Sequence, residues 1–297
     1  MIAVVVLTCA APPGMLEDCL ASLRASSPVP DDEINVYVVD NGTMAARRLA
    51  ARPELGTCTL ITSIRNSGFA GGMNIGIERA LADGAHTVVI LNDDVVVDTN
   101  WLAPLMTEFT IDDRVGAVQP KLLIADSEPA LVNSLGVRLG ADGAGLDIGI
   151  GELDTGENDA RPIELFTGGA VALRASFLRE VGMFDERFFL YYEDVDLGLR
   201  GTERGWTYRC APASRVMHRG SATTSSQPDR TAYLRERNRL WILVRHRPIG
   251  DVARGFWLSV RRVRHHPRRV HLRALIAGVG AIPRLLISRI RAPKLST

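Results

Sequence analysis

Lysine, cysteine and long apolar runs are all scarce in this sequence of 297 residues. Lys121 and Lys294 are the only lysines, so arginine supplies nearly all of the positive charge. The four cysteines show no CxxC spacing, which argues against a zinc site or a disulfide framework and favours a reducing cytoplasm. The best apolar run, Ala274 to Pro283, has ten residues, well short of the ~20 that span a bilayer.

Two common phosphate-binding signatures are also absent. The glycine-rich segment Arg65–Asn74 has neither the GxxxxGK[ST] spacing of a P-loop nor the GxGxxG spacing of a dinucleotide site. Such a segment at a helix start can still offer backbone N–H groups to an anion, or it can serve only as a tightly packed turn. The N-terminal apolar run follows no basic residue, which predicts a core strand and not a signal peptide.

Positive and negative charges are unevenly distributed along the chain. Residues 235–297 hold 16 basic and 2 acidic side chains, whereas residues 1–234 hold 19 basic and 32 acidic ones, for a net charge of +1. A basic extension on an acidic body suggests a polyanionic partner. Because the extension has no recognised nucleic-acid-binding module and few interleaved aromatics, we expect an anionic membrane surface and no nucleic acid.

The extension also places apolar residues at helical spacing among its arginines. The apolar positions are Leu272, Leu275, Ile276, Val279, Ile282, Leu285, Leu286 and Ile290. This pattern predicts a helix lying on an anionic membrane, where each basic residue contributes about 1 kcal/mol. The alternatives are a helix packed on the protein's own acidic body and a contact between copies in a homo-oligomer.

In the first hundred residues, apolar β-branched runs alternate with helical patterns. Strands are expected at residues 2–8, 34–39, 57–64 and 87–91, with helices at 15–25 and 73–81. This alternation predicts an α/β fold with βαβ units and a largely parallel sheet. Ligands of such sheets bind at the carboxyl ends of the strands, so function is expected near Asp40, residues 66–74 and Asp93–Asp94.

The second half of the sequence has a less regular pattern. Glycines among alternating apolar residues predict a hairpin or an irregular excursion within residues 133–152. The other expected elements are a strand over 167–173, a helix over 193–204, short strands over 206–209 and 215–218, and helices from 231 onward.

Two adjacent carboxylates in Asn92-Asp93-Asp94 directly follow an apolar strand. Neighbouring carboxylates are unfavourable unless a cation compensates them. Mg²⁺ or Mn²⁺ suits such oxygen ligands, and substrate phosphates commonly complete the coordination. His218, at the end of another apolar run, could add an imidazole ligand. The alternatives are a solvated acidic turn and a histidine that only fills surface or core space.

A second acidic group, Glu193-Asp194-Val195-Asp196, follows an aromatic run at residues 188–192. Aromatic side chains beside a carboxylate exclude water and raise its pKa, as a general base requires. The alternative is a helix start, where acidic residues interact favourably with the helix dipole. The two interpretations are compatible, because a base at a helix start is held rigidly.

The order and spacing of these segments resemble family 2 glycosyltransferases, which are inverting enzymes with the GT-A fold. The resemblance is strongest to bacterial enzymes that add rhamnose or related sugars to cell-surface glycans and glycolipids. It covers roughly residues 1–240 and rests on residues 38–42, 66–76, 91–94, 167–170, 182–189, 192–197 and 218–221. It implies an α/β, Rossmann-like GT-A domain over residues 1–230 and an arginine-rich helical extension over 231–297.

The resemblance also implies a role for individual residues. Asp194 matches the catalytic base, and Asp94 and His218 match the ligands of a divalent metal, Mn²⁺ or Mg²⁺. The resemblance also implies a set of residues that contact a dTDP- or UDP-linked sugar donor or the acceptor. They are Thr8, Asp40, Asn66, Gly68, Asn74, Asp93, Gly168, Gly169, Glu193 and Arg237. Of these, Gly168 and Gly169 lie where the family lets the acceptor approach.

The implied activity is metal-dependent, inverting transfer of a sugar to a hydroxyl of a cell-envelope glycan or a polyprenyl-lipid-linked acceptor. The implied location is the cytoplasmic face of the cell membrane. One departure is Thr8-Cys9-Ala10-Ala11-Pro12, where similar enzymes often have Tyr or Asn with a nearby Arg. The alternative is a binding or scaffold protein at the membrane that keeps the fold without turnover, although Asp94, Asp194 and His218 are all present.

Overall fold

The computed structural model describes residues 1–9, 12, 14–42, 58–220, 227–264 and 267–291, with the side chains of Ile290 and Arg291 outside that set. Its strands are β1 (Ile2–Thr8), β2 (Ile34–Asn41), β3 (Thr59–Ser63), β4 (Thr87–Asn92), β5 (Val95–Val97), β6 (Val115–Ile124), β7 (Val132–Ser134), β8 (Val137–Leu139), β9 (Gly145–Asp147), β10 (Arg161–Ile163), β11 (Ala170–Arg174) and β12 (Thr207–His218). Its helices are α1 (Met15–Ala25), α3 (Gly68–Ala82), α4 (Leu102–Phe109), α5 (Ala175–Val181), α6 (Glu193–Thr202), α8 (Pro228–His246), α9 (Ile249–Arg262) and α10 (Arg268–Arg291), with a short 3₁₀ turn η2 (Glu186–Phe188).

A mostly parallel central sheet with flanking helices organises the chain, in the order β10-β12-β6-β11-β4-β1-β2-β3. Strands β4, β1, β2 and β3 are parallel, and β11 is antiparallel to both β4 and β6. The register pairs Thr8 with Asp40 and Leu7 with Asn92. The carboxyl ends of three parallel strands therefore meet at one edge of the sheet, where α/β folds place their ligands.

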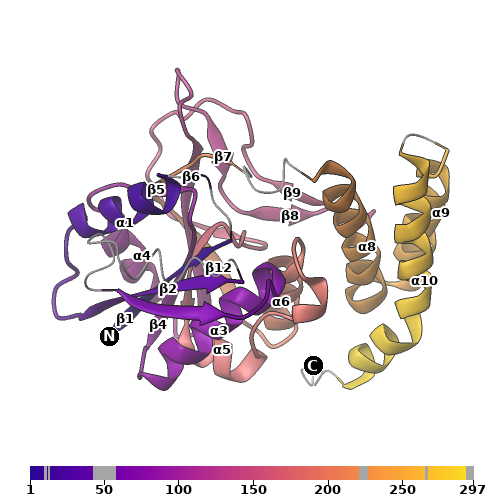
Figure 1. The fold of residues 1–297 in the computed structure, drawn as a ribbon, viewed down its shortest axis with the longest axis horizontal. Helices are drawn as coiled ribbons and strands as arrows, with labels where there is room; N and C mark the ends of the chain where they lie inside the picture. The colour runs from indigo at the N-terminus through magenta and orange to yellow at the C-terminus, as the bar shows by residue number, and fades with distance from the viewer. Residues whose placement is uncertain (10–11, 13, 43–57, 221–226, 265–266, 292–297) are drawn as a thin grey trace.

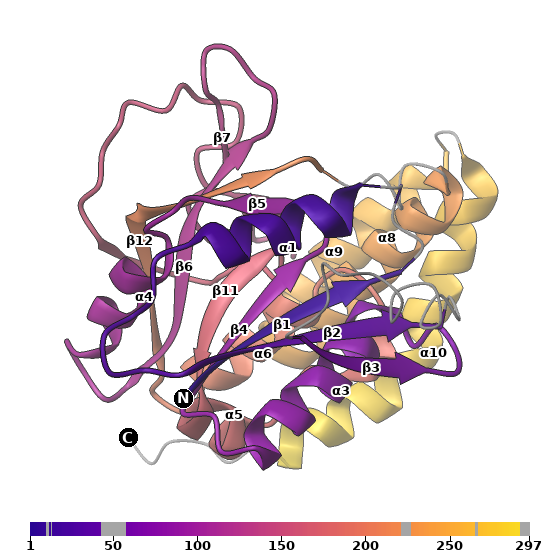
Figure 2. The same cartoon turned by 60° about the vertical axis from the view of Figure 1, so that its left-hand side comes forward.

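Helices cover both faces of the sheet (Figures 1 and 2). Alternate residues of β1 point to opposite faces: Val4 and Val6 pack in the cluster with α1 and α4, and Val5 packs in the cluster with α3, α5 and α6. Burying each such side chain stabilises the fold by roughly 1.5–3 kcal/mol. Helix α3 lies close to the sheet because Gly76 has no side chain, since a Cβ there would be 2.3 Å from Val5 Cγ1.

The last three helices stand together at the end of the molecule away from α1 and α4 (Figure 1). Helix α8 packs on the domain through Trp241, whose ring meets Phe188 edge-on. Helix α10 then packs on α8, and a Cβ on Gly278 would lie 2.7 Å from Leu240. A buried ion pair between Glu236 and Arg239 on α8, at 2.8 Å, adds a polar anchor inside this layer.

Most elements expected from the sequence are confirmed, including the core strand at the N-terminus, the hairpin β8–β9 and the helical extension. The four cysteines are free thiols. The expectation of two strands at 206–209 and 215–218 is wrong, because β12 is one strand with a register shift between Ala211 and Arg215. The ten-residue apolar run is part of the longer helix α10, and residues Arg268–Arg289 are long and apolar enough to cross a membrane by length and composition.

Candidate active site

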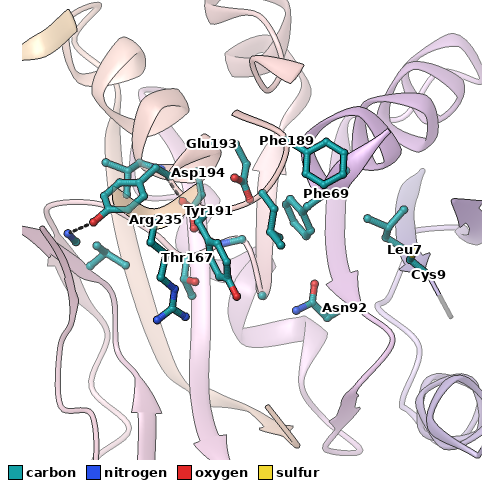
Figure 3. Close-up of a pocket in the computed structure, with 18 of the residues that line it drawn as sticks. Leu7, Cys9, Phe69, Asn92, Thr167, Phe189, Tyr191, Glu193, Asp194 and Arg235 are labelled. Carbon is teal, nitrogen blue, oxygen red and sulfur yellow. Dashed lines mark hydrogen bonds between the residues drawn. The ribbon is translucent and has the colours of Figure 1, made fainter. Parts of the chain in front are cut away.

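A pocket of about 530 Å³ lies at the carboxyl edge of the sheet, between β1, β4, α3 and the start of α6 (Figure 3). It brings together nine of the residues predicted from the sequence: Asn66, Gly68, Asp93, Asp94, Gly168, Gly169, Glu193, Asp194 and His218. We call it the catalytic pocket. The carboxylates at the end of β4 and at the start of α6 therefore line one cavity, although 100 residues separate Asp94 from Asp194.

Asp94 and His218 face each other across one side of the pocket. His218 Nε2 lies 3.3 Å from Asp94 Oδ1, and both atoms are buried without a hydrogen-bond partner in the described part of the chain. On the other side of the ring, Nδ1 lies 2.8 Å from Asn133 Oδ1, which favours a proton on Nδ1 and a free lone pair on Nε2. Two buried acceptors that face each other fit a divalent cation.

The protein supplies only part of a coordination shell at this site. Among the described residues, no group of three or more His, Cys, Asp or Glu side chains is arranged to hold a metal. Mg²⁺ and Mn²⁺ are commonly bound by one or two protein ligands together with waters and substrate phosphates. The arrangement of Asp94 and His218 therefore suits a metal bound together with a diphosphate.

Asp93 lies beside this pair and faces the end of β1. Burial, together with the charge of Asp94, raises the pKa of Asp93 to about 6, although a hydrogen bond from Thr8 opposes the shift. Thr8 does not line the pocket itself, but it positions a carboxylate that does. This arrangement gives Thr8 an indirect part in the site.

Asp194 is held at the start of α6 by two backbone N–H groups. Gly168 N donates to Asp194 Oδ2 at 2.7 Å, and Val195 N donates to Oδ1 at 2.8 Å. Burial nevertheless raises the pKa of Asp194 to about 6, and the charge of Asp147 contributes. A fixed carboxyl group that loses its proton close to neutral pH can act as a general base.

Glu193 lies next to Asp194 and is more deeply buried. Its Oε2 has no hydrogen-bond partner among the described residues. Burial, reinforced by the charge of Asp194, raises the pKa of Glu193 well above its usual range. A protonated carboxyl at this position can both donate a hydrogen bond to a polar ligand and accept one from it.

The aromatic segment before α6 has an unusual backbone. Phe189, Tyr191 and Tyr192 all have positive φ angles, of 68°, 69° and 71°. Such conformations cost about 1–3 kcal/mol each and persist only where the surroundings enforce them. Gly68 allows the close approach of this segment, because a Cβ there would lie 2.2 Å from the carbonyl oxygen of Phe189.

Asn238 on α8 enforces this backbone. Its buried side-chain amide donates to the carbonyl oxygens of Phe188, Leu190 and Tyr191 at 3.0, 2.9 and 2.7 Å. The neighbouring Arg237 donates to the Phe188 carbonyl at 2.7 Å. Helix α8, the first helix of the extension, thus positions the segment that leads into Glu193 and Asp194.

Three other predicted residues lie outside the lining of the catalytic pocket. Asn74 does not face a ligand, because its amide bonds both the N–H and the carbonyl of Phe184, at 3.1 and 2.9 Å. Asp40 is buried at the end of β2, next to residues outside the described set. Arg237 lines a different cavity, described below.

Two charged lining residues were not predicted from the sequence. Asp147 reaches the pocket from the hairpin β8–β9, and Arg235 reaches it from α8 with its guanidinium 4.4 Å from the ring centre of Tyr191 (Figure 3). Burial raises the pKa of Asp147. Neither residue follows a strand of the parallel sheet, so the signal that identified Asp94 is missing for both.

Comparison with known proteins identifies the family. The model for "Glycosyltransferase like family 2" matches residues 2–242. N-acetylglucosaminyl-diphospho-decaprenol L-rhamnosyltransferase of Mycobacterium tuberculosis is 27% identical over 233 residues, which is 72% of this chain and 74% of that protein.

Two solved structures share the fold. GalNAc-T7, solved with UDP, GalNAc and Mn²⁺, matches with a TM-score of 0.68 and 14% identity over 98% of this chain and 58% of its own. Mannosyltransferase PcManGT from Pyrobaculum calidifontis, solved with GDP-Man and Mn²⁺, matches with a TM-score of 0.55 and 20% identity over 99% of this chain and 76% of its own. The chain belongs to glycosyltransferase family 2 and is a glycosyltransferase with the GT-A fold.

Proposed function

We propose that this chain is a metal-dependent inverting glycosyltransferase that uses a nucleoside-diphosphate sugar. The observation that carries the proposal is that Asp94 and His218 line the same pocket as Asp194. The first two residues suit a metal bound to the donor's diphosphate, and the third suits proton removal from an acceptor hydroxyl. The two solved neighbours both contain Mn²⁺ and a nucleotide or nucleotide sugar, which supports this choice of cofactor and donor class.

The donor and acceptor are proposed from the named relative. Its name describes rhamnosyl transfer and a diphospho-decaprenol-linked acceptor. We propose a rhamnose-type donor, dTDP- or UDP-linked, and a hydroxyl of a polyprenyl-lipid-linked or other cell-envelope glycan as acceptor. Asn66, Gly68 and Asp93, which line the pocket, would contact the nucleotide, and Thr8 would act through its hydrogen bond to Asp93.

The reaction follows from the positions of the side chains. Asp94 and His218 would hold Mn²⁺ or Mg²⁺, which when bound offsets the negative charge that develops on the leaving diphosphate. Asp194 accepts the proton of the acceptor hydroxyl as that oxygen attacks the anomeric carbon from the side opposite the diphosphate. A single attack from that side inverts the anomeric configuration, and Gly168 and Gly169 leave room for the acceptor.

We further propose that residues 231–297 hold the catalytic domain, residues 1–230, on the cytoplasmic face of an anionic membrane. One side of α10 is buried through Ala274, Ala281 and Leu285. Leu272, Ile276 and Val279 remain exposed on this helix, as does Trp257 on α9. Helix α10 therefore packs on α8, within the extension itself and not on the acidic body, and still presents an apolar face flanked by arginines to an interface.

A thermal-shift screen tests the function directly. Nucleotide sugars are added with and without Mn²⁺ or Mg²⁺, and the stabilising donor is then supplied with a hydroxyl acceptor. A metal-dependent rise in Tm followed by formation of an inverted glycoside supports the proposal. A donor that binds without any hydrolysis or transfer across the panel would instead favour a binding or scaffold protein.

A further inference from the structure

A second cavity, of about 780 Å³, lies between the segment before α6 and the helices α8 and α10. We call it the arginine cavity. Its lining contains two acidic side chains and five arginines: Arg187, Arg230, Arg237, Arg269 and Arg273. The lining therefore carries a net positive charge.

Three of these arginines, Arg230, Arg269 and Arg273, are available to an anion. Arg187 pairs with Asp185. In the described part of the chain, no carboxylate forms an ion pair with Arg230, Arg237, Arg269 or Arg273, but Arg237 already donates to Asn238 Oδ1 and to the carbonyl oxygens of Arg187 and Phe188. Guanidinium groups are always charged, and two of them can bind the oxygens of one phosphate through several N–H donors.

Two of the arginines, one from α8 and one from α10, lie near the ring of Tyr233. The guanidinium carbons of Arg237 and Arg273 lie 5.6 and 5.5 Å from the ring centre of Tyr233. Arg237 is partly buried, and this burial lowers its pKa. Like charges gathered at a partly buried position are unfavourable unless an anion compensates them.

The arginine cavity adjoins the catalytic pocket. Phe189 lines both of them, and the guanidinium of Arg230 lies 4.7 Å from the centre of the Phe189 ring. A ligand that places a sugar in the catalytic pocket could therefore place an attached anionic group among the arginines.

The arginine cavity also adjoins the exposed apolar face of α10. On a helix, residues three apart are neighbours, so Arg269 lies beside Leu272 and Arg273 lies beside Ile276. Leu272 is 46% exposed and Ile276 is 63% exposed. An apolar chain attached to the anionic group could therefore continue along α10.

We propose that the arginine cavity binds the diphosphate of a prenyl-linked acceptor. The acceptor sugar would enter the catalytic pocket, and the prenyl chain would follow the apolar face of α10 towards the membrane. The inference rests on the proposed function, because it names how the acceptor of that reaction is recognised. It assigns to α8 and α10 a part in substrate binding in addition to membrane attachment.

The test measures binding of a short prenyl diphosphate without turnover. The full chain is titrated calorimetrically with geranyl diphosphate, and separately with inorganic pyrophosphate, in a buffer that lacks divalent metal. The test variants are R269A/R273A on α10 and, on a different helix, R230A. The matched controls are R254A/R261A, two exposed arginines of α9 outside the arginine cavity, and D94N in the catalytic pocket.

We expect R269A/R273A to weaken geranyl diphosphate binding by at least about tenfold, because each change removes a charge-assisted contact. R230A should weaken it by a smaller factor, and both controls should bind within about twofold of the unmodified chain. Pyrophosphate should bind more weakly than geranyl diphosphate. An unchanged Tm identifies variants whose fold is intact, since the altered residues of α10 lie at the surface.

Several results would overturn the assignment. These are no binding of geranyl diphosphate, equal binding by R269A/R273A and R254A/R261A, or a changed affinity in D94N alone, which would place the diphosphate in the catalytic pocket. Equal affinity for the two probes would indicate a site for free phosphate and reject a prenyl-linked ligand. The measurement needs no donor or turnover, so failure of the proposed transfer reaction would be seen separately in the donor assay.

Discussion

The catalytic pocket and the arginine cavity share Phe189 but have opposite charge. The catalytic pocket gathers carboxylates from β4 and α6, and burial raises the pKa of Asp93 and Asp194. The arginine cavity gathers guanidinium groups from α8 and α10. Carboxylates kept close together require a cation or a proton, whereas clustered arginines require an anion. The contrast suggests that the domain handles the donor and the proton, and that the extension handles the anionic part of the acceptor.

Removing the Asp194 carboxylate from the catalytic pocket should have the largest effect on the rate of transfer. We expect D194N to lower kcat by ~10²–10⁴-fold, because the amide cannot accept the hydroxyl proton. Steady-state transfer kinetics measure the change. The control is E152Q, an exposed carboxylate outside both cavities. Turnover by D194N within a factor of two of the control would remove Asp194 from the mechanism.

Asn238 connects α8 of the extension to the segment before α6, and its loss should have the next largest effect on the rate of transfer. N238A removes the donor to three carbonyl groups that hold the positive-φ segment before α6. A small displacement of the catalytic carboxylate can cost about 10²-fold in rate. We expect kcat to fall with little change in the KM of the donor, whereas N100A, an exposed asparagine, should behave normally. A rise in donor KM without loss of kcat would contradict this positioning role.

The pH dependence of turnover tests the role of one carboxyl group in the catalytic pocket, that of Asp194. Asp194 must be ionised to accept a proton, and burial raises its pKa to about 6. Activity should therefore fall about tenfold per pH unit below this value and level off above it. The acidic limb of kcat/KM against pH measures the effect, with Glu193 and Asp147 as the nearby groups that can move it. A flat profile down to pH 4.5 would argue against Asp194 as the base.

Membrane attachment should show the smallest effect. We expect I276S/V279S to weaken binding to anionic vesicles by roughly tenfold, because each change removes an exposed apolar side chain. The matched control is I111S/I150S, two exposed residues of the catalytic domain. Point changes are preferable to deletion of the extension, since deletion would uncover Leu240 beneath α10. Equal sedimentation of both variants with vesicles would reject the membrane role.

The parallel part of the fold could be predicted because its central strands, β1 and β4, are buried on both faces. Val4, Val5 and Val6 are all fully buried, so β1 has the continuous apolar run typical of parallel strands. The local sequence predicts two strands within β12 because Pro212 interrupts the pattern, and a proline inside a strand weakens its prediction. Its actual continuity depends on pairing with β6, which the local sequence does not specify.

Local sequence pattern predicts the site residues that follow strands or begin a helix, whereas Gly168 and Gly169 come from the family resemblance. Asp94, Asp194 and His218 meet these conditions and line one pocket. Asp147 and Arg235 reach the same pocket from the hairpin β8–β9 and from α8, and only tertiary packing places them there. Asn74 is in a predicted segment, but its amide is occupied by the backbone of Phe184.

Calorimetric titration with UDP and with dTDP, each in the presence and absence of Mn²⁺, compares the roles of Asp94 and Asp194 most directly. The account predicts that D94N loses the metal-dependent part of nucleotide affinity. It predicts that D194N binds the nucleotide and metal like the unmodified chain, although transfer is lost in both variants. Metal-dependent affinity that is unchanged in D94N, or transfer that persists in D194N, would contradict the claim that one pocket joins a metal-bound diphosphate to a general base.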